Sequence, residues 1–323
     1  MNATELTVPR TSRFNAGFWL VVLGAALWGV DPLFRVILLK WLTSTQIVLL
    51  EHIILFFVAA PVLWRHRTEL QGIGWRRVFA LLFVSWGGSA IATILFTQGL
   101  MHGDLNAVLL LQKLQPLFAI VLARVILKEV LPKYFGFLFI LALLGTYLLT
   151  FGWTLPFGHV NDFVQVGSLL SLGAAALWGG STVMGSYLLR TMKYETVTSL
   201  RFALALPLLI IVTLSEGQSW NLSIGTLDAS LVFINLLLQA LLPGLLSLLL
   251  YYKGLGTTKA SYATLAELSF PMVGVLINWI VFQQVVTWTQ LLGFVFIWFT
   301  LFYISRQKQE VATPGQTLQS AQA

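Results

Sequence analysis

The sequence predicts an all-α membrane protein whose ten transmembrane helices form two inverted five-helix repeats. Three observations carry this prediction: the composition, a series of long apolar segments and an internal repeat. Of the 323 residues, 58% are hydrophobic and only 10% are charged, whereas about 25% of the residues of a soluble domain are charged. Such a chain suits a lipid environment, in which every backbone polar group must pair within helices or closed barrels.

The apolar segments justify the helices in turn. A helix that crosses the bilayer needs about 20 apolar residues, and a barrel strand needs only about ten in strict alternation, so these longer segments favour helices. They place the helices at 15–39, 45–64, 78–100, 104–127, 132–151, 165–189, 194–214, 228–250, 259–283 and 287–305. The resulting organisation is a tail at 1–14, a first repeat at 15–151, a second repeat at 165–305 and a tail at 306–323.

The two tails are expected to lie outside the membrane. Residues 1–14 are polar and lead into a full-length helix, so they are not expected to be a cleavable signal peptide. The tail from Arg306 onward is polar, contains Pro314 and Gly315, and is expected to be disordered.

The charges of the loops predict the orientation. If the N-terminus is cytoplasmic, fourteen Lys and Arg residues fall on the cytoplasmic side and only Lys40 falls on the other. Because cytoplasmic loops concentrate positive charge, both termini are predicted to be cytoplasmic. The loops thereby account for the net charge of +7, and no nucleic-acid partner is expected. The fourteen are Arg10, Arg13, Arg65, Arg67, Arg76, Arg77, Lys128, Lys133, Arg190, Lys193, Lys253, Lys259, Arg306 and Lys308.

The internal repeat predicts how the helices are related. The pentapeptide Ala-Ala-Leu-Trp-Gly at 25–29 recurs at 175–179, an offset of 150, and Pro116 matches Pro271 at an offset of 155. Five helices per half is an odd number, so the halves must have opposite orientations. Inverted repeats are a transporter architecture, with the substrate site near the bilayer midplane between them.

These features carry a family resemblance. Ten helices as five plus five, a Leu-Trp-Gly in the first helix of each half and a proline in the fourth helix of each half resemble the EamA-type transporters of the drug/metabolite transporter superfamily. Glu129 matches an acidic residue common after the fourth helix, whereas the second half has Gln284 at the equivalent place. The resemblance covers roughly 17–305. It implies export or exchange of small metabolites across the bacterial inner membrane.

The ionisable residues within the predicted helices are candidates for function. A charge at the centre of a membrane helix costs about 2.5–3.5 kcal/mol on insertion scales, so it is a functional hypothesis by default. Stabilising ion pairs are the structural alternative, and Glu51 is expected to pair with Arg35 or Lys113. Depth along the helices predicts an outer cluster and an inner cluster of polar residues. The first contains Asp31, Arg35, Glu51, His52 and Lys113, and the second contains Arg201 and Glu267.

The two helical prolines mark further candidates. A proline leaves the carbonyl four residues earlier without its usual donor, so Pro116 and Pro271 are expected to free the carbonyls of Gln112 and Glu267. We expect these places to line the substrate cavity, with a simple packing kink as the alternative. Trp28 and Trp178, at equivalent positions of the two repeats, are expected in the cavity wall.

The predicted function is secondary transport by alternating access. The partners expected are the lipid bilayer, a small polar substrate such as an amino acid, and protons; export is the expected direction, and a homodimer remains open. The chain has no cysteine, which excludes thiolate metal sites, and neither a metal nor a cofactor is expected. A multidrug or toxic-compound exporter and an intramembrane enzyme are the alternatives. The enzyme is disfavoured because the sequence lacks a His-Glu-x-x-His motif.

Overall fold

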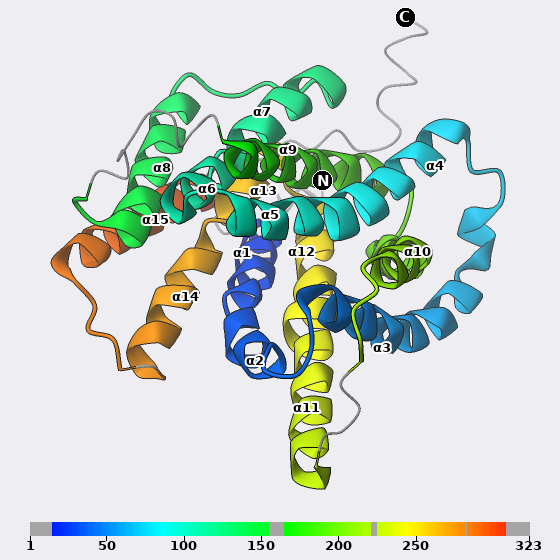
Figure 1. Cartoon of the computed structure of the whole chain (residues 1–323). Coiled ribbons are helices and arrows are strands. Elements are labelled where there is room, and N and C mark those ends of the chain that lie inside the picture. The colour runs from blue at the N-terminus through cyan, green and yellow to red at the C-terminus, as the bar shows by residue number, and fades with distance from the viewer. Residues whose placement is uncertain (1–14, 155–164, 221–224, 282, 308–323) are drawn as a thin grey trace, which may run out of the picture.

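The chain folds into a bundle of helices without strands in its described part. The structure is a computed structural model and describes residues 15–154, 165–220, 225–281 and 283–307 (Figure 1). The predicted tail at 1–14, and residues 308–323 of the predicted tail at 306–323, therefore lie outside the described residues.

The first repeat contains five helical spans. Its first and fourth spans are each broken into two helices, and its third contains a π-helical segment between two α-helices. The spans are α1 (Ala16–Trp28) with α2 (Asp31–Leu38), α3 (Ser44–Arg65), α4 (Trp75–Leu82) with η2 (Phe83–Ile91) and α5 (Ala92–His102), α6 (Leu105–Gln112) with α7 (Gln115–Ile126), and α8 (Phe135–Phe151).

The second repeat has the same order, but its first span is unbroken. The spans are α9 (Val166–Leu189), α10 (Tyr194–Ser215), α11 (Thr226–Gln239) with η4 (Ala240–Leu246) and α12 (Ser247–Leu255), α13 (Ala260–Ala266) with α14 (Ser269–Ile280), and α15 (Trp288–Ser305).

Each of the ten predicted segments coincides with one of these spans. Among the described residues, nine spans are long and apolar enough to cross a membrane, and α8 is a shorter apolar helix of 17 residues. The predicted all-α membrane fold is therefore confirmed.

Local sequence explains where several helices begin. Thr43 and Gln46 form a capping box at the start of α3, and Thr287 and Gln290 form another at the start of α15. In each box the Thr hydroxyl accepts an amide hydrogen bond and the Gln side chain accepts one in return, which satisfies two amides that have no partner within the helix.

Proline explains the breaks in the fourth span of each repeat. The helix is interrupted at Lys113–Leu114 and again at Glu267–Leu268. Pro116 and Pro271 follow within the first turn of α7 and of α14, where a residue without an amide hydrogen is tolerated. The breaks place polar residues at helix ends in the middle of the membrane-spanning bundle.

Packing reflects the repeat. The helix α1, in the first span of the first repeat, packs against α12, in the third span of the second repeat. In the same way α9, in the first span of the second repeat, packs against α5, in the third span of the first. A methyl group at Gly99 would lie 2.9 Å from the carbonyl oxygen of Gly167, and one at Gly254 would meet the backbone of Gly17. Small residues of this kind let membrane helices approach closely. Figure 1 shows α1 beside α12 and α15 beside α8.

Two names are used below for the ends of the bundle. The terminal face is the end at which α1 begins and α15 ends, and it includes Glu129 and Ala260. The distal face is the opposite end, at which α2 ends and α6 begins.

Candidate functional site

A cavity of about 440 Å³ lies between the two repeats. This volume is within the range of roughly 300–1,000 Å³ that holds small-molecule ligands. Its wall includes Trp28, Asp31, Arg35, Glu51, His52, Gln112, Lys113, Pro116, Trp178, Arg201 and Glu267. Residues predicted from the sequence as an outer and an inner cluster thus face one cavity.

The end of the cavity near the distal face carries a charge cluster around Arg35. The guanidinium donates from Nε and Nη2 to the two oxygens of Asp31, both at 2.6 Å. Its Nη2 also lies 4.0 Å from Oε2 of Glu51. The amide of Gln239, from α11 of the second repeat, donates to Asp31. One cation is therefore shared by two carboxylates, and the cluster joins the repeats.

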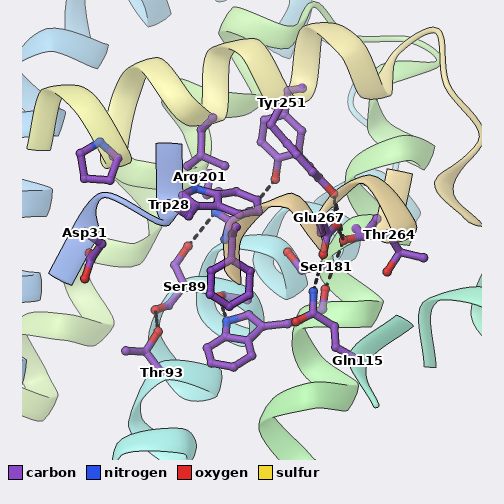
Figure 2. A pocket seen from close by; sticks show the side chains of 18 of the residues that line it. Trp28, Asp31, Ser89, Thr93, Gln115, Ser181, Arg201, Tyr251, Thr264 and Glu267 are labelled. Carbon is purple, nitrogen blue, oxygen red and sulfur yellow. Dashed lines mark hydrogen bonds between the residues drawn. The ribbon is translucent and has the colours of Figure 1, made fainter. Parts of the chain in front are cut away.

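The other end of the cavity carries a hydrogen-bonded carboxylate. Oε1 of Glu267 accepts from the Tyr251 hydroxyl at 2.6 Å and from the Thr182 hydroxyl at 3.0 Å. Its Oε2 accepts from the amide of Gln115 at 2.6 Å. Figure 2 shows Gln115, Glu267 and Tyr251 gathered at this end, with Asp31 away from them. Three donors around one carboxyl group are suited to holding it as an anion.

Arg201 lies in the wall between these groups. Its Nε donates to the Ser89 hydroxyl at 2.8 Å and its Nη1 donates to the Tyr252 hydroxyl at 2.7 Å. Lys113 places its ammonium 4.8 Å from the centre of the Phe270 ring. Among the described residues, neither cation has a carboxylate oxygen within 4 Å. Both cations therefore keep hydrogen-bonding capacity for a molecule in the cavity.

Three buried polar atoms in the wall have no partner within the described part of the chain. They are Nε2 of His52, Oγ of Ser181 and Oγ1 of Thr264. These residues are at most 7% exposed, and the other ring nitrogen of His52 bonds to the Val48 carbonyl at 2.8 Å. A buried polar atom without a partner is costly. Hydrogen bonds from a bound ligand would remove that cost.

Aromatic rings form much of the remaining wall. Trp28 lies against Tyr251 with the ring centres 5.1 Å apart. Trp178 lies 5.5 Å from Phe96, and its Nε1 donates to the Gly88 carbonyl at 3.0 Å. Rings fixed in this way offer flat apolar surfaces to a planar ligand.

Burial changes along the cavity. The side chains of Arg35 and Asp31, next to the distal face, are 25% and 27% exposed. Tyr252 and Thr264, nearest the terminal face, are fully buried. The cavity therefore opens toward the distal face.

The structure corrects and completes several expectations. The free carbonyl expected at Glu267 is wrong, because that carbonyl accepts the Phe270 amide at 3.1 Å in a tighter turn. Pro116 lines the cavity, whereas Pro271 lies beside it in the first turn of α14. Of the two partners considered for Glu51, Arg35 is the near one.

Sequence reasoning missed the neutral partners of these charges. Gln115, Thr182 and Tyr251 surround Glu267, and Ser89 and Tyr252 hold Arg201. Hydroxyl groups are common in membrane helices, so none of the four hydroxyl residues carried a signal. Gln115 carried a weak one, since it directly precedes Pro116.

Comparison with known proteins gives consistent results. The profile of the EamA-like transporter family matches residues 15–151 and 165–306. The riboflavin transporter ImpX of Fusobacterium nucleatum subsp. nucleatum is 31% identical over 90% of this chain and 97% of its own. A riboflavin transporter of Brucella anthropi is 26% identical over 55% of this chain and 59% of its own.

A solved structure shares the fold. A crystal structure with 16% sequence identity superposes with a TM-score of 0.73 and covers 92% of this chain and 98% of its own. At that identity, the likeness concerns the arrangement of the helices alone.

Proposed function

Because this chain belongs to the EamA-like transporter family, we propose that it imports riboflavin or a close flavin analogue by alternating access. Membership of this family places the chain among transporters and not among enzymes. The two relatives described above are riboflavin transporters by name. A flavin is therefore favoured over the amino acid that the paired acids and bases suggest.

The observation that carries this proposal is the combination of flat rings and unpartnered polar atoms in one cavity. The tricyclic ring system of a flavin is planar and would pack against Trp28 and Tyr251. The ribityl chain carries several hydroxyl groups, which both donate and accept hydrogen bonds. Those groups would satisfy His52, Ser181 and Thr264. No amino acid combines a flat tricyclic surface with a series of hydroxyls.

The charged residues of the cavity would then have two roles, binding of the flavin and coupling of transport to protons. Lys113 and Arg201 are donors without a carboxylate partner in the described residues, and they suit the carbonyl oxygens at the edge of the flavin ring. Glu267 would contribute to substrate or proton binding, since its three donors all come from other spans. A change in its protonation would alter contacts between four spans at once.

The orientation that we infer for the chain decides which face of the cavity meets the cell exterior. The fourteen-to-one bias of Lys and Arg supports a terminal face in the cytoplasm of a bacterial cell, with the protein in the inner membrane. The cavity, open toward the distal face, then accepts substrate from outside. Export passes through such a state as well, so uptake is proposed over the expected export because of the likeness to riboflavin transporters.

Uptake of labelled riboflavin tests the proposal. The chain would be expressed in a riboflavin-auxotrophic bacterium without a flavin importer, and then reconstituted in liposomes. We expect saturable riboflavin uptake that excess unlabelled riboflavin suppresses and that a mixture of amino acids leaves unchanged. The variant Ser181→Ala should weaken uptake, whereas Val295→Ala, at a position 60% exposed on the outside of α15, should not. Uptake of amino acids but not of riboflavin by the purified protein would overturn the proposal.

A further inference from the structure

The carboxylate of Glu129 ties the two repeats together at the terminal face. Its Oε1 accepts the Ala260 amide at 2.7 Å, and its Oε2 accepts the amide and the hydroxyl of Ser261 at 3.1 and 2.6 Å. Glu129 follows α7 of the first repeat, whereas Ala260 and Ser261 begin α13 of the second. Lys259, just before α13, donates from Nζ to the Val130 carbonyl at 3.2 Å. Four hydrogen bonds therefore hold these two broken spans together.

The backbone before Glu129 has an uncommon form that recurs in the second repeat. Lys128 has a φ of 56° and Gln283 has a φ of 57°, and they are the non-glycine residues with positive φ in the described part of the chain. Positive φ is found in only a few per cent of non-glycine residues. The two positions differ by 155, the offset that also relates Pro116 to Pro271. Gln284 therefore occupies in the second repeat the place that Glu129 occupies in the first.

Among the described residues, the structure shows no equivalent contact at the distal face. Gln284 is exposed, and its side chain has no hydrogen bond within the described residues. Its expected partner, by the same offset, is the start of α6. There Asp104 accepts the Ala107 amide at 2.9 Å and so caps its own helix. In the described part of the chain, the contact is therefore formed at the closed terminal face and is not found at the distal face, toward which the cavity opens.

We propose that Glu129 and Gln284 are alternating latches, of which one closes the terminal face and the other closes the distal face. The residue types fit this division. Glu129 accepts hydrogen bonds from two backbone amides next to Lys259, and a negatively charged side chain is favoured at such a position. Gln284 would face Asp104, the residue equivalent to Lys259, and its amide can donate a hydrogen bond to that carboxylate, whereas a glutamate there would repel it. The inference concerns the cycle of the carrier and holds for any substrate.

Spin labels can report the state of both faces, because the chain has no cysteine of its own. One pair would be placed at Val130 and Gly256 on the terminal face, and a second at the equivalent positions, Val285 and Met101, on the distal face. All four positions are exposed. Electron–electron double resonance in liposomes then gives the distance distribution for each pair.

The variant Glu129→Gln should open the terminal face. Hydrogen bonds to a charged group are stronger than those to a neutral one, so we expect the minor population with a longer Val130–Gly256 distance to rise about tenfold. The population with a shorter Met101–Val285 distance should rise by the same factor. Glu195→Gln makes the same chemical change at the same face, in the first turn of α10, and should leave both distributions as in the parent protein.

The variant Gln284→Glu should have the opposite effect. It lies at an exposed position and so should fold normally, but its carboxylate would repel Asp104 when the distal face closes. The population with that face closed should fall, and adding Asp104→Asn, which keeps a capping side chain, should restore it. Unchanged distance distributions in folded Glu129→Gln would overturn the latch at Glu129. Unchanged distance distributions in Gln284→Glu would overturn the latch at Gln284.

Discussion

Removing the positive charge of Arg35 should destabilise the protein more than removing either of its partners. The guanidinium is shared by Asp31 at 2.6 Å and by Glu51 at 4.0 Å. The variant Arg35→Met leaves two carboxylates side by side in a cavity wall without a cation. The variant Glu51→Gln leaves Arg35 fully bonded to Asp31.

The expected magnitudes follow from these distances. Leaving a buried charge without its partner costs about 3–5 kcal/mol. We expect the lower end, about 3 kcal/mol, for Arg35→Met because Asp31 and Arg35 are about a quarter exposed. The attraction between charges 4 Å apart is about 4 kcal/mol at an effective dielectric constant of about 20. The cost of burying Glu51 offsets most of it, so Glu51→Gln should change stability by less than about 1 kcal/mol.

Thermal unfolding in detergent would measure the difference, with the twelve tryptophans of the chain as the fluorescence probe. At roughly 2 °C per kcal/mol for a chain of this size, Arg35→Met should lower the Tm by about 6 °C and Glu51→Gln by at most about 2 °C. The triple variant Asp31→Asn, Arg35→Met, Glu51→Gln has no charge left to pair and should recover most of the loss.

Two results would refute this reasoning. One is a triple variant no more stable than Arg35→Met. The other is a loss for Glu51→Gln as large as that for Arg35→Met, which would mean that Glu51, and not Asp31, is the main partner. The sequence allowed both pairs, because Asp31 and Arg35 are four residues apart on one helix face, and Glu51 was expected to pair with Arg35 or Lys113.

Three further predictions test other parts of the structure. Glu267→Gln should keep the fold and the contact with Gln115. It should lower transport at least about tenfold, because the negative charge that the three donors stabilise is lost. Near-normal transport at several pH values would reject a role for Glu267. Gly254→Val should prevent α1 and α12 from packing and cost about 3 kcal/mol or more in stability, whereas Gly274→Ala, with open space around it, should be tolerated. Reporter fusions after Ser305 should be active in the cytoplasm, and those after Gly152 outside it; the reverse pattern would invert the inferred orientation.

The sequence by itself determined the helical spans and their repetition. Hydrophobicity is a property of each residue, so a run of about 20 apolar residues identifies a span without any knowledge of its neighbours. The recurrence of Trp28 at Trp178 and of Pro116 at Pro271 related the two halves. The cost of a charge in the membrane likewise pointed to Arg35, Arg201 and Glu267 before any contact was known.

The tertiary structure alone decided which groups meet. Asp31 bonds to Gln239 across 208 positions of sequence, and Glu267 bonds to Gln115 across 152. Such pairs depend on how each helix is rotated about its axis and where it breaks, and both are settled by the packing of all the spans together. The same holds for the turn at Glu267, whose carbonyl finds the Phe270 amide, and for the matching backbone at Lys128 and Gln283. Composition located the charges, and packing assigned their partners.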